Sequence, residues 1–133
     1  MNYLAVYDNI TGNRLAFLQN AYAIGYKLQL AKLDEATFTM PADDPKNVFC
    51  KPYNYVELWD GEDYVGLFRI LPSTQTKNAS QRDIVYTCES VLATLMDDVL
   101  FGWHEMGNLG VYTTEVISYI LSKQTTQRWT LSA

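Results

Sequence analysis

A strand, a tight turn and a returning strand can be read in residues 55–71, YVELWDGEDYVGLFRIL. Val56 and Leu58 alternate with other residue types, as expected for a strand with one buried face. Asp60-Gly61 follows, and this dipeptide supplies the positive φ angles that tight hairpin turns need. Residues 64–71 are apolar on both faces, so this strand is predicted to be central in a sheet or covered on both sides.

Other strands are predicted before and after this hairpin. Strand-like runs occur at residues 3–7, 14–18, 26–33, 36–40 and 83–89. The first two are joined by a turn cluster that contains Gly12, which predicts a hairpin. The third and fourth form a second hairpin, in which Tyr26, Leu28 and Leu30 share the apolar face of the first strand. Pro41 ends the second hairpin, because proline has no N–H for the ladder.

Three short helical segments are predicted. Asp44 and Pro45 suit the N-cap and first position of one or two helical turns. After Ser90 the apolar period changes from two to about 3.6, which predicts a short helix. Its apolar stripe consists of Val91, Leu92, Leu95 and Met96. Thr113 or Thr114 caps a further helix with Glu115 in its first turn, and its buried stripe consists of Val116, Ile117, Ile120 and Leu121.

The predicted fold class is α+β, with a predominantly antiparallel β-sheet, barrel-like or sandwich, and two short helices packed against it. Residues 1–133 are interpreted as one module, with a mainly β core over 1–89 and an α+β part over 90–133. The polar stretch 73–82 is expected to be a loop or arm. The run 99–104 is expected to be extended. Trp129-Thr130-Leu131 resembles the beginning of a strand, so we interpret the chain as the N-terminal part of a longer protein.

Composition excludes several classes of protein. The 133 residues are 48% hydrophobic and 19% charged, which suits one folded core. Ten Lys and Arg against fifteen Asp and Glu give a net charge of −5, which argues against a nucleic-acid binder or an anionic-membrane binder. No apolar run approaches ~18 residues, so no membrane-spanning helix is expected.

The enzyme hypothesis rests on Cys88 as a nucleophile and His104, the only histidine, as its base, with Asp97 or Asp98 orienting the ring. However, Cys88 alternates with Tyr86 in an apolar strand, which favours a buried structural thiol. Cys50 and Cys88 fit neither a disulfide framework nor a metal motif. A single optional disulfide between them stays open, and we predict no catalytic residue.

Metal and nucleotide motifs are weak. A metal site would have to use Asp43, Asp44, Asp97, Asp98 and His104. Adjacent acidic residues do not converge on one ion without a loop built for it, so these pairs are expected to cap helices or solvate turns. Residues 60–63 are interpreted as a turn rather than a calcium loop. Residues 107–110 lack the lysine and the spacing of a nucleotide loop. We therefore predict no metal and no cofactor.

Aromatic residues are the more informative group. Ten tyrosines and three tryptophans are present. Such side chains are enriched in protein–protein contacts and sugar-binding faces, although they also favour β-strands in general. A carbohydrate-binding module therefore stays open as an alternative function.

Three stretches, taken in order, resemble a known family. They are LDEATFTMPADDPKN at 33–47, VELWDG at 56–61 with GLFRILP at 66–72, and YTCESVLATL at 86–95. Together they resemble the N-terminal region of phage minor structural proteins of the prophage endopeptidase tail type, which are tail-associated proteins of phages of Gram-positive bacteria. The resemblance covers nearly the whole chain.

This resemblance implies a structural baseplate or tail-tip hub rather than an enzyme. It implies a β-rich module that assembles with itself, as a trimer, and contacts the distal tail protein and the tail tube. The composition, as argued above, predicts no nucleic-acid binding and no membrane insertion. The implied location is the virion tail tip, after synthesis in the bacterial cytoplasm. Peptidoglycan-cleaving activity would belong to parts beyond residue 133. The alternatives are a cell-wall peptidase or a carbohydrate-binding module of a tail protein.

Overall fold

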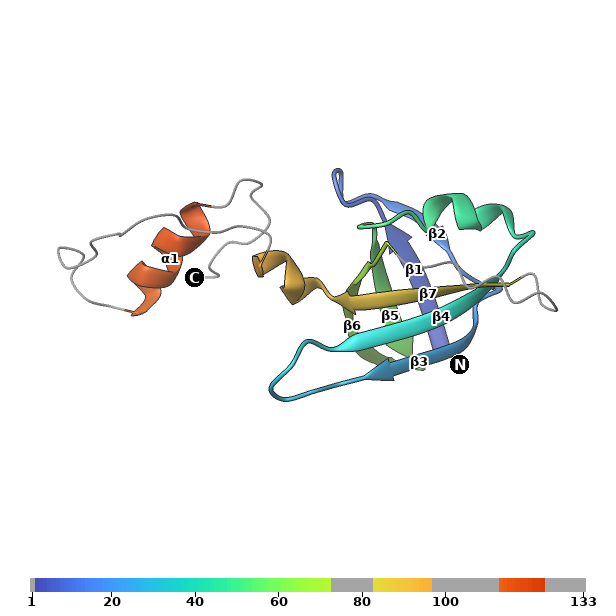
Figure 1. Ribbon diagram of the computed structural model, residues 1–133, viewed down its shortest axis with the longest axis horizontal. Coiled ribbons are helices and arrows are strands. Elements are labelled where there is room, and N and C mark those ends of the chain that lie inside the picture. The colour runs from blue at the N-terminus through green and yellow to red at the C-terminus, as the bar shows by residue number, and fades with distance from the viewer. Residues whose placement is uncertain (1, 73–82, 97–112, 124–133) are drawn as a thin grey trace. The chain divides into compact units, whose positions relative to one another are not determined.

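The computed structural model describes residues 2–72, 83–96 and 113–123 (Figure 1). The chain falls into two compact units, Met1–Ala93 and Thr94–Ala133. The predictions for residues 73–82, for residues 99–104 and for Trp129-Thr130-Leu131 lie outside the described residues. The division into 1–89 and 90–133 stays a prediction.

Seven antiparallel strands build the first unit. They are β1 (Asn2–Tyr7), β2 (Arg14–Phe17), β3 (Tyr22–Lys27), β4 (Glu35–Pro41), β5 (Tyr55–Asp60), β6 (Asp63–Ile70) and β7 (Asp83–Ser90). Their order across the sheet is β2-β1-β5-β6-β7-β4-β3. The predicted antiparallel sheet is therefore confirmed, and β6, from the predicted two-sided run, lies at its centre.

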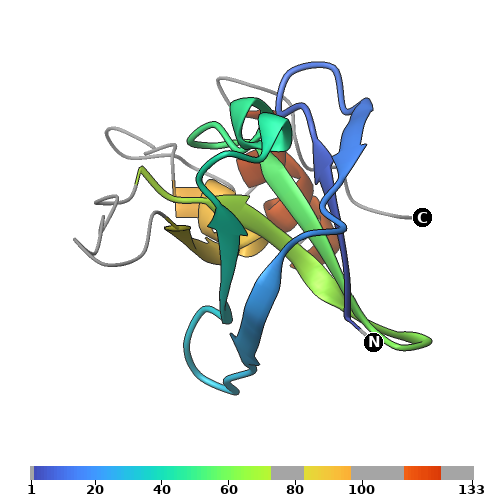
Figure 2. The same ribbon diagram turned by 90° about the vertical axis from the view of Figure 1, so that its right-hand side faces the viewer.

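The sheet bends over on itself but stays open. In Figure 1 and in the rotated view of Figure 2, β4 and β3 lie across from β1 and β5. Only residues 18–21 connect β2 to β3, yet within the described residues no ladder joins these two strands. The predicted barrel or sandwich is thus replaced by one curved open sheet.

Two local features explain why the edges do not pair. The side-chain Nζ of Lys46 donates to the carbonyl of Phe17 at 2.6 Å, so a side chain already occupies an acceptor at the end of β2. On β3, the register shifts between Tyr22 and Gly25, and Ala23 has a φ of 50°. A bulged edge strand cannot form a regular ladder along its whole length.

One hydrophobic core lies between the two halves of the bent sheet. It is formed by alternate residues of five strands together with Leu18 and Cys50: Leu4, Val6, Ala36, Phe38, Met40, Val56, Leu58, Phe68, Ile70, Tyr86 and Cys88. The rings of Phe38 and Tyr86 stack across β4 and β7, with centroids 5.1 Å apart. The Tyr86 hydroxyl donates to Asn47 at 2.9 Å, so this buried ring keeps a polar partner.

The second predicted hairpin exists, but its first strand lies earlier than predicted. β3 ends at Lys27, and residues 28–34 form a wide connection to β4. Asp34 accepts a hydrogen bond from the backbone N–H of Gln29 at 2.7 Å, and the Gln29 amide donates to the Leu33 carbonyl at 2.9 Å. These local bonds compete with the ladder. The predicted burial of Leu28 and Leu30 is wrong, since they are 58% and 110% exposed.

Asp44 begins the first helical segment as predicted. η1 (Pro45–Phe49) is a single stretch of 3₁₀-helix, with Asp44 at its N-cap and Pro45 at its first position. The Asp44 carboxylate accepts from the N–H of Lys46 at 2.8 Å and from the side chain of Asn20 at 2.7 Å. The cap therefore also ties the β2–β3 connection to η1.

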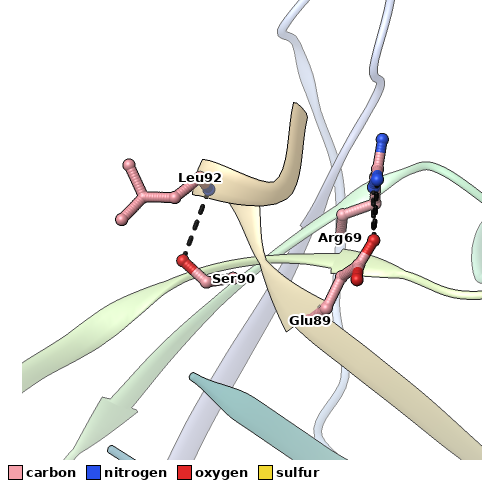
Figure 3. A network of polar contacts seen from close by, with 4 residues as sticks. All are labelled: Arg69, Glu89, Ser90 and Leu92. Carbon is pink, nitrogen blue, oxygen red and sulfur yellow. Dashed lines mark hydrogen bonds and ion pairs between the residues drawn. The ribbon is translucent and has the colours of Figure 1, made fainter. Parts of the chain in front are cut away.

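The segment after β7 is helical but not α-helical. Figure 3 shows Ser90 accepting from the N–H of Leu92, at 3.3 Å, at the start of η2 (Val91–Met96). Because a 3₁₀-helix has three residues per turn, it does not bury the stripe expected from a 3.6-residue period. Leu92 and Leu95 are 50% and 46% exposed, whereas Ala93 is buried. The predicted stripe is therefore wrong for these two leucines.

The same view shows the ion pair that joins β6 to β7. Arg69 and Glu89 lie opposite each other in the ladder, and their side chains meet at 2.7 Å (Figure 3). Both side chains are largely covered, at 11% and 21% exposed.

The last predicted helix is confirmed. α1 (Thr113–Ser122) belongs to the second unit and carries Glu115 in its first turn. Ile117 and Ile120, from its predicted stripe, are 40% and 44% exposed, so their predicted burial is wrong. Packing of α1 against the sheet stays a prediction.

Candidate functional site: an aromatic groove on the outer sheet face

Alternation in β5 places three side chains together on the outer face of the sheet. Val56 and Leu58 point into the core, so Tyr55, Glu57 and Trp59 point to the opposite side. The core that folds the sheet therefore also sets the direction of these three side chains.

Pairing then adds residues from both neighbouring strands. Tyr7 of β1 lies opposite Tyr55, Leu67 of β6 lies opposite Glu57, and Tyr64 of β6 lies opposite Trp59. With Gly12 of the β1–β2 turn, these residues line a groove of about 640 Å³. We call it the aromatic groove. It belongs wholly to the first unit.

Glu57 is the charged centre of the aromatic groove. Its carboxylate accepts a hydrogen bond from the indole N–H of Trp59. A hydrogen bond from Tyr7 to the same carboxylate, with burial and the negative charge of Glu57, raises the pKa of Tyr7 to about 12. In the described ranges, 2–72, 83–96 and 113–123, no lysine or arginine forms an ion pair with Glu57.

The rings of Trp59 and Tyr64 form two inclined walls. Their centroids are 5.1 Å apart, and their planes meet at 60°. Burial, followed by the charge of Glu57, raises the pKa of the Tyr64 phenol. Tyr64 nevertheless stays 54% exposed, so the groove opens to solvent beside it.

Aromatic residues continue along the outer face beyond the groove. The rings of Tyr3 on β1 and Phe17 on β2 lie 5.1 Å apart. The guanidinium of Arg14 lies 4.3 Å from the centre of the Phe17 ring, and that of Arg69 lies 5.7 Å from the Tyr53 ring. Two arginine side chains of the protein itself therefore stack on aromatic rings of this face.

Of the residues of the nucleophile hypothesis, the structure describes only Cys88, so their meeting stays untested. Cys88 is 1% exposed in the core, and burial raises the pKa of its thiol. Burial, followed by the charge of Asp44, raises the pKa of Cys50 to about 12. Both cysteines are free. These are the surroundings of unreactive thiols, because the thiolate is the nucleophilic form. His104, Asp97 and Asp98 lie outside the described residues.

The acidic residues considered as metal ligands have other roles where the structure describes them. Asp44 caps η1, and Asp43 is exposed. Residues 60–63 form the β5–β6 turn, with Gly61 at a φ of 65°. Within the described ranges, no three His, Cys, Asp or Glu side chains are placed to hold a metal ion. Residues 107–110 lie outside those ranges.

The described helices were compared with the requirements of a membrane-spanning helix. None of them combines the length and the apolar character that a membrane crossing requires.

Sequence reasoning identified the aromatic residues as a class but missed the groove. The spacing Tyr55-x-Glu57-x-Trp59 around the buried Val56 and Leu58 is the signal that would have placed three of its members on one face. Tyr7 and Tyr64 join them only through strand pairing.

Neither a protein-family model nor a curated protein matches the sequence.

Proposed function

We propose that this chain is a structural module of a phage tail tip or baseplate hub. It acts by assembling with copies of itself, three in a ring, and with the distal tail protein and the tail tube. The phage context rests on the resemblance of residues 33–47, 56–61 with 66–72, and 86–95 to tail-associated minor structural proteins. We assign no catalytic role to the chain, and the proposed location is the virion tail tip.

The exposed apolar tip of the β3–β4 hairpin is the observation that carries the assembly proposal. We call residues 28–34 the leucine tip. Leu28 and Leu30 are 58% and 110% exposed there, although local hydrogen bonds hold the loop in a defined shape. Single exposed apolar residues are common on proteins, but two on one ordered projecting loop suit insertion into a neighbouring subunit.

The open sheet supports the same proposal. Within the described residues, β2 pairs with β1 alone and β3 with β4 alone, so the sheet has two free edges. The leucine tip adjoins the β3 edge, whose bulge limits the strands that can pair with it. One surface that contacts a different surface on the next copy makes a heterologous interface, and such interfaces are all satisfied when a ring closes.

Light scattering on the full-length protein tests the proposal. We expect a mass of three subunits, and the double variant Leu28→Ser/Leu30→Ser is expected to be a folded monomer. Ile10→Ser is the matched control, because Ile10 is 89% exposed on a different loop and its replacement should leave the trimer intact. A wild-type protein that stays strictly monomeric at high concentration would contradict the hub.

The peptidase alternative has a separate test. Cys88→Ala and His104→Ala are compared with wild type in a peptidoglycan hydrolysis assay. We expect no hydrolysis by any of the three. Hydrolysis by the wild type that both variants lose while they stay folded would establish the enzyme instead.

A further inference from the structure

We infer that the aromatic groove binds a small organic cation of the methylated ammonium class, held by the faces of Trp59 and Tyr64 and by the carboxylate of Glu57. This inference does not depend on ring assembly. It would stand for a monomer as well as for a trimer.

The arrangement of the rings offers several aromatic faces to a cation that lies in the groove beside them, not between Trp59 and Tyr64, whose rings contact each other. Trp59 and Tyr64 stand at 60° to each other, and Tyr7 and Tyr55 line the same groove from β1 and β5. A quaternary or methylated ammonium is attracted to the negative faces of several rings at once, and aromatic cages of this type recognise such groups.

The carboxylate adds the matching charge. Glu57 is held in place by hydrogen bonds from Trp59 and Tyr7, and within the described ranges it has no cationic partner of its own. A quaternary ammonium is weakly hydrated and has no N–H with which to donate a hydrogen bond. It therefore needs a nearby negative charge and ring faces, and the groove supplies both. The net charge of −5 also favours the approach of cations.

The direct test compares two ligands of the same shape, one charged and one uncharged. Choline chloride and its uncharged carbon isostere, 3,3-dimethyl-1-butanol, are titrated into the full chain while the indole N–H signal of Trp59 is followed by NMR. We expect saturable binding of choline at this signal and binding of the isostere at least about ten-fold weaker, the difference expected for a desolvated cation on rings and beside a carboxylate.

Two variants locate the binding. Glu57→Gln keeps the shape of the side chain but removes its charge, so choline binding should weaken about ten-fold while binding of the isostere is unchanged. Glu62→Gln is the matched control, because Glu62 is exposed in the turn of the same hairpin and outside the groove. Thermal unfolding of both variants checks that each is folded.

Four results would overturn the inference. Equal affinity for choline and the isostere would make the groove an unspecific apolar pocket. Binding of methyl glycosides but not choline would make it a sugar site. Choline binding that survives Glu57→Gln unchanged, or that leaves the Trp59 signal unmoved, would place the cation elsewhere.

Discussion

At the scale of single residues, burial rather than residue type decides how much a leucine contributes. Leu58 is 0% exposed between the two halves of the sheet, whereas Leu30 projects from the leucine tip. Both occupy alternating apolar positions in the sequence, and the alternation alone predicted that both are buried. Only Leu58 has neighbours from other strands around it.

The two leucines therefore make a matched pair for a stability measurement. Leu58→Ala removes buried methyl groups and leaves a cavity, so we expect the free energy of unfolding to fall by about 3 kcal/mol. Leu30→Ala should change it by less than about 0.5 kcal/mol, because the side chain gains no burial on folding. Urea unfolding, at a protein concentration low enough to keep the protein monomeric, measures both changes in the free energy of unfolding. Similar losses for the two variants would contradict the register of β5 or the exposure of the leucine tip.

At the scale of elements, short-range caps hold the segments between strands. The clearest is Asp44, whose carboxylate accepts from Lys46 at the start of η1 and from Asn20 in the β2–β3 connection. These hydrogen bonds, first that from Lys46 and then that from Asn20, lower the pKa of the Asp44 carboxyl below its ordinary value of 3.8. The Asp44 side chain therefore links η1 to the β2–β3 connection, which joins the two edge strands of the sheet.

Asp44→Ala tests this link and its pH dependence. We expect the free energy of unfolding to fall by about 1–2 kcal/mol at pH 7, because the variant loses an N-cap and an additional hydrogen bond. Because the folded-state pKa is lowered, the stabilisation by the charged carboxylate is present above pH 3.8 and is lost as the pH falls below that value through the folded pKa. The difference in free energy of unfolding between wild type and variant should therefore become smaller at low pH.

Chemical denaturation at pH 7 and at pH 3 measures that difference. Asp43→Ala is the matched control, because Asp43 is the exposed neighbour of Asp44 and its loss should have little effect at either pH. If both variants are equally destabilised, general charge effects rather than the cap explain the loss.

At the scale of the whole molecule, the first unit contains a complete core. Every residue of the hydrophobic cluster lies between Leu4 and Cys88, inside the unit Met1–Ala93. β7 is the last strand of that unit, and it joins β4 to β6 in the sheet. Without β7, the hairpin of β3 and β4 would lose its ladder connection to the other half.

Two truncated proteins test this organisation. A chain of residues 1–96 should unfold in one cooperative thermal transition, because it retains all seven strands and η2. A chain of residues 1–82 lacks β7 and should show no such transition. Calorimetry distinguishes them. Failure of the longer piece to fold would show that residues beyond 96 are required for the sheet.

The features that the sequence predicted correctly depend on residues close together in the chain. Asp60-Gly61 specified the turn of β5 and β6, Asp44-Pro45 specified the start of η1, and alternation in β4 and β5 specified their buried faces. Each depends on a hydrogen bond, a φ angle or a period that is local to a few residues. A residue-by-residue reading can therefore recover them without knowledge of the rest of the chain.

Tertiary structure decided what depends on partners far apart in the chain. Burial of common faces decides that β1 pairs with β5 and that β2 and β3 remain edges. Local hydrogen bonds that compete with the ladder end the third strand early, at Lys27. The aromatic groove is of this kind, because Tyr7 meets Glu57 only through the β1–β5 register. Local patterns set the direction of each side chain, but long-range burial selects its neighbours, since many registers satisfy the same alternation and only one fills the common core.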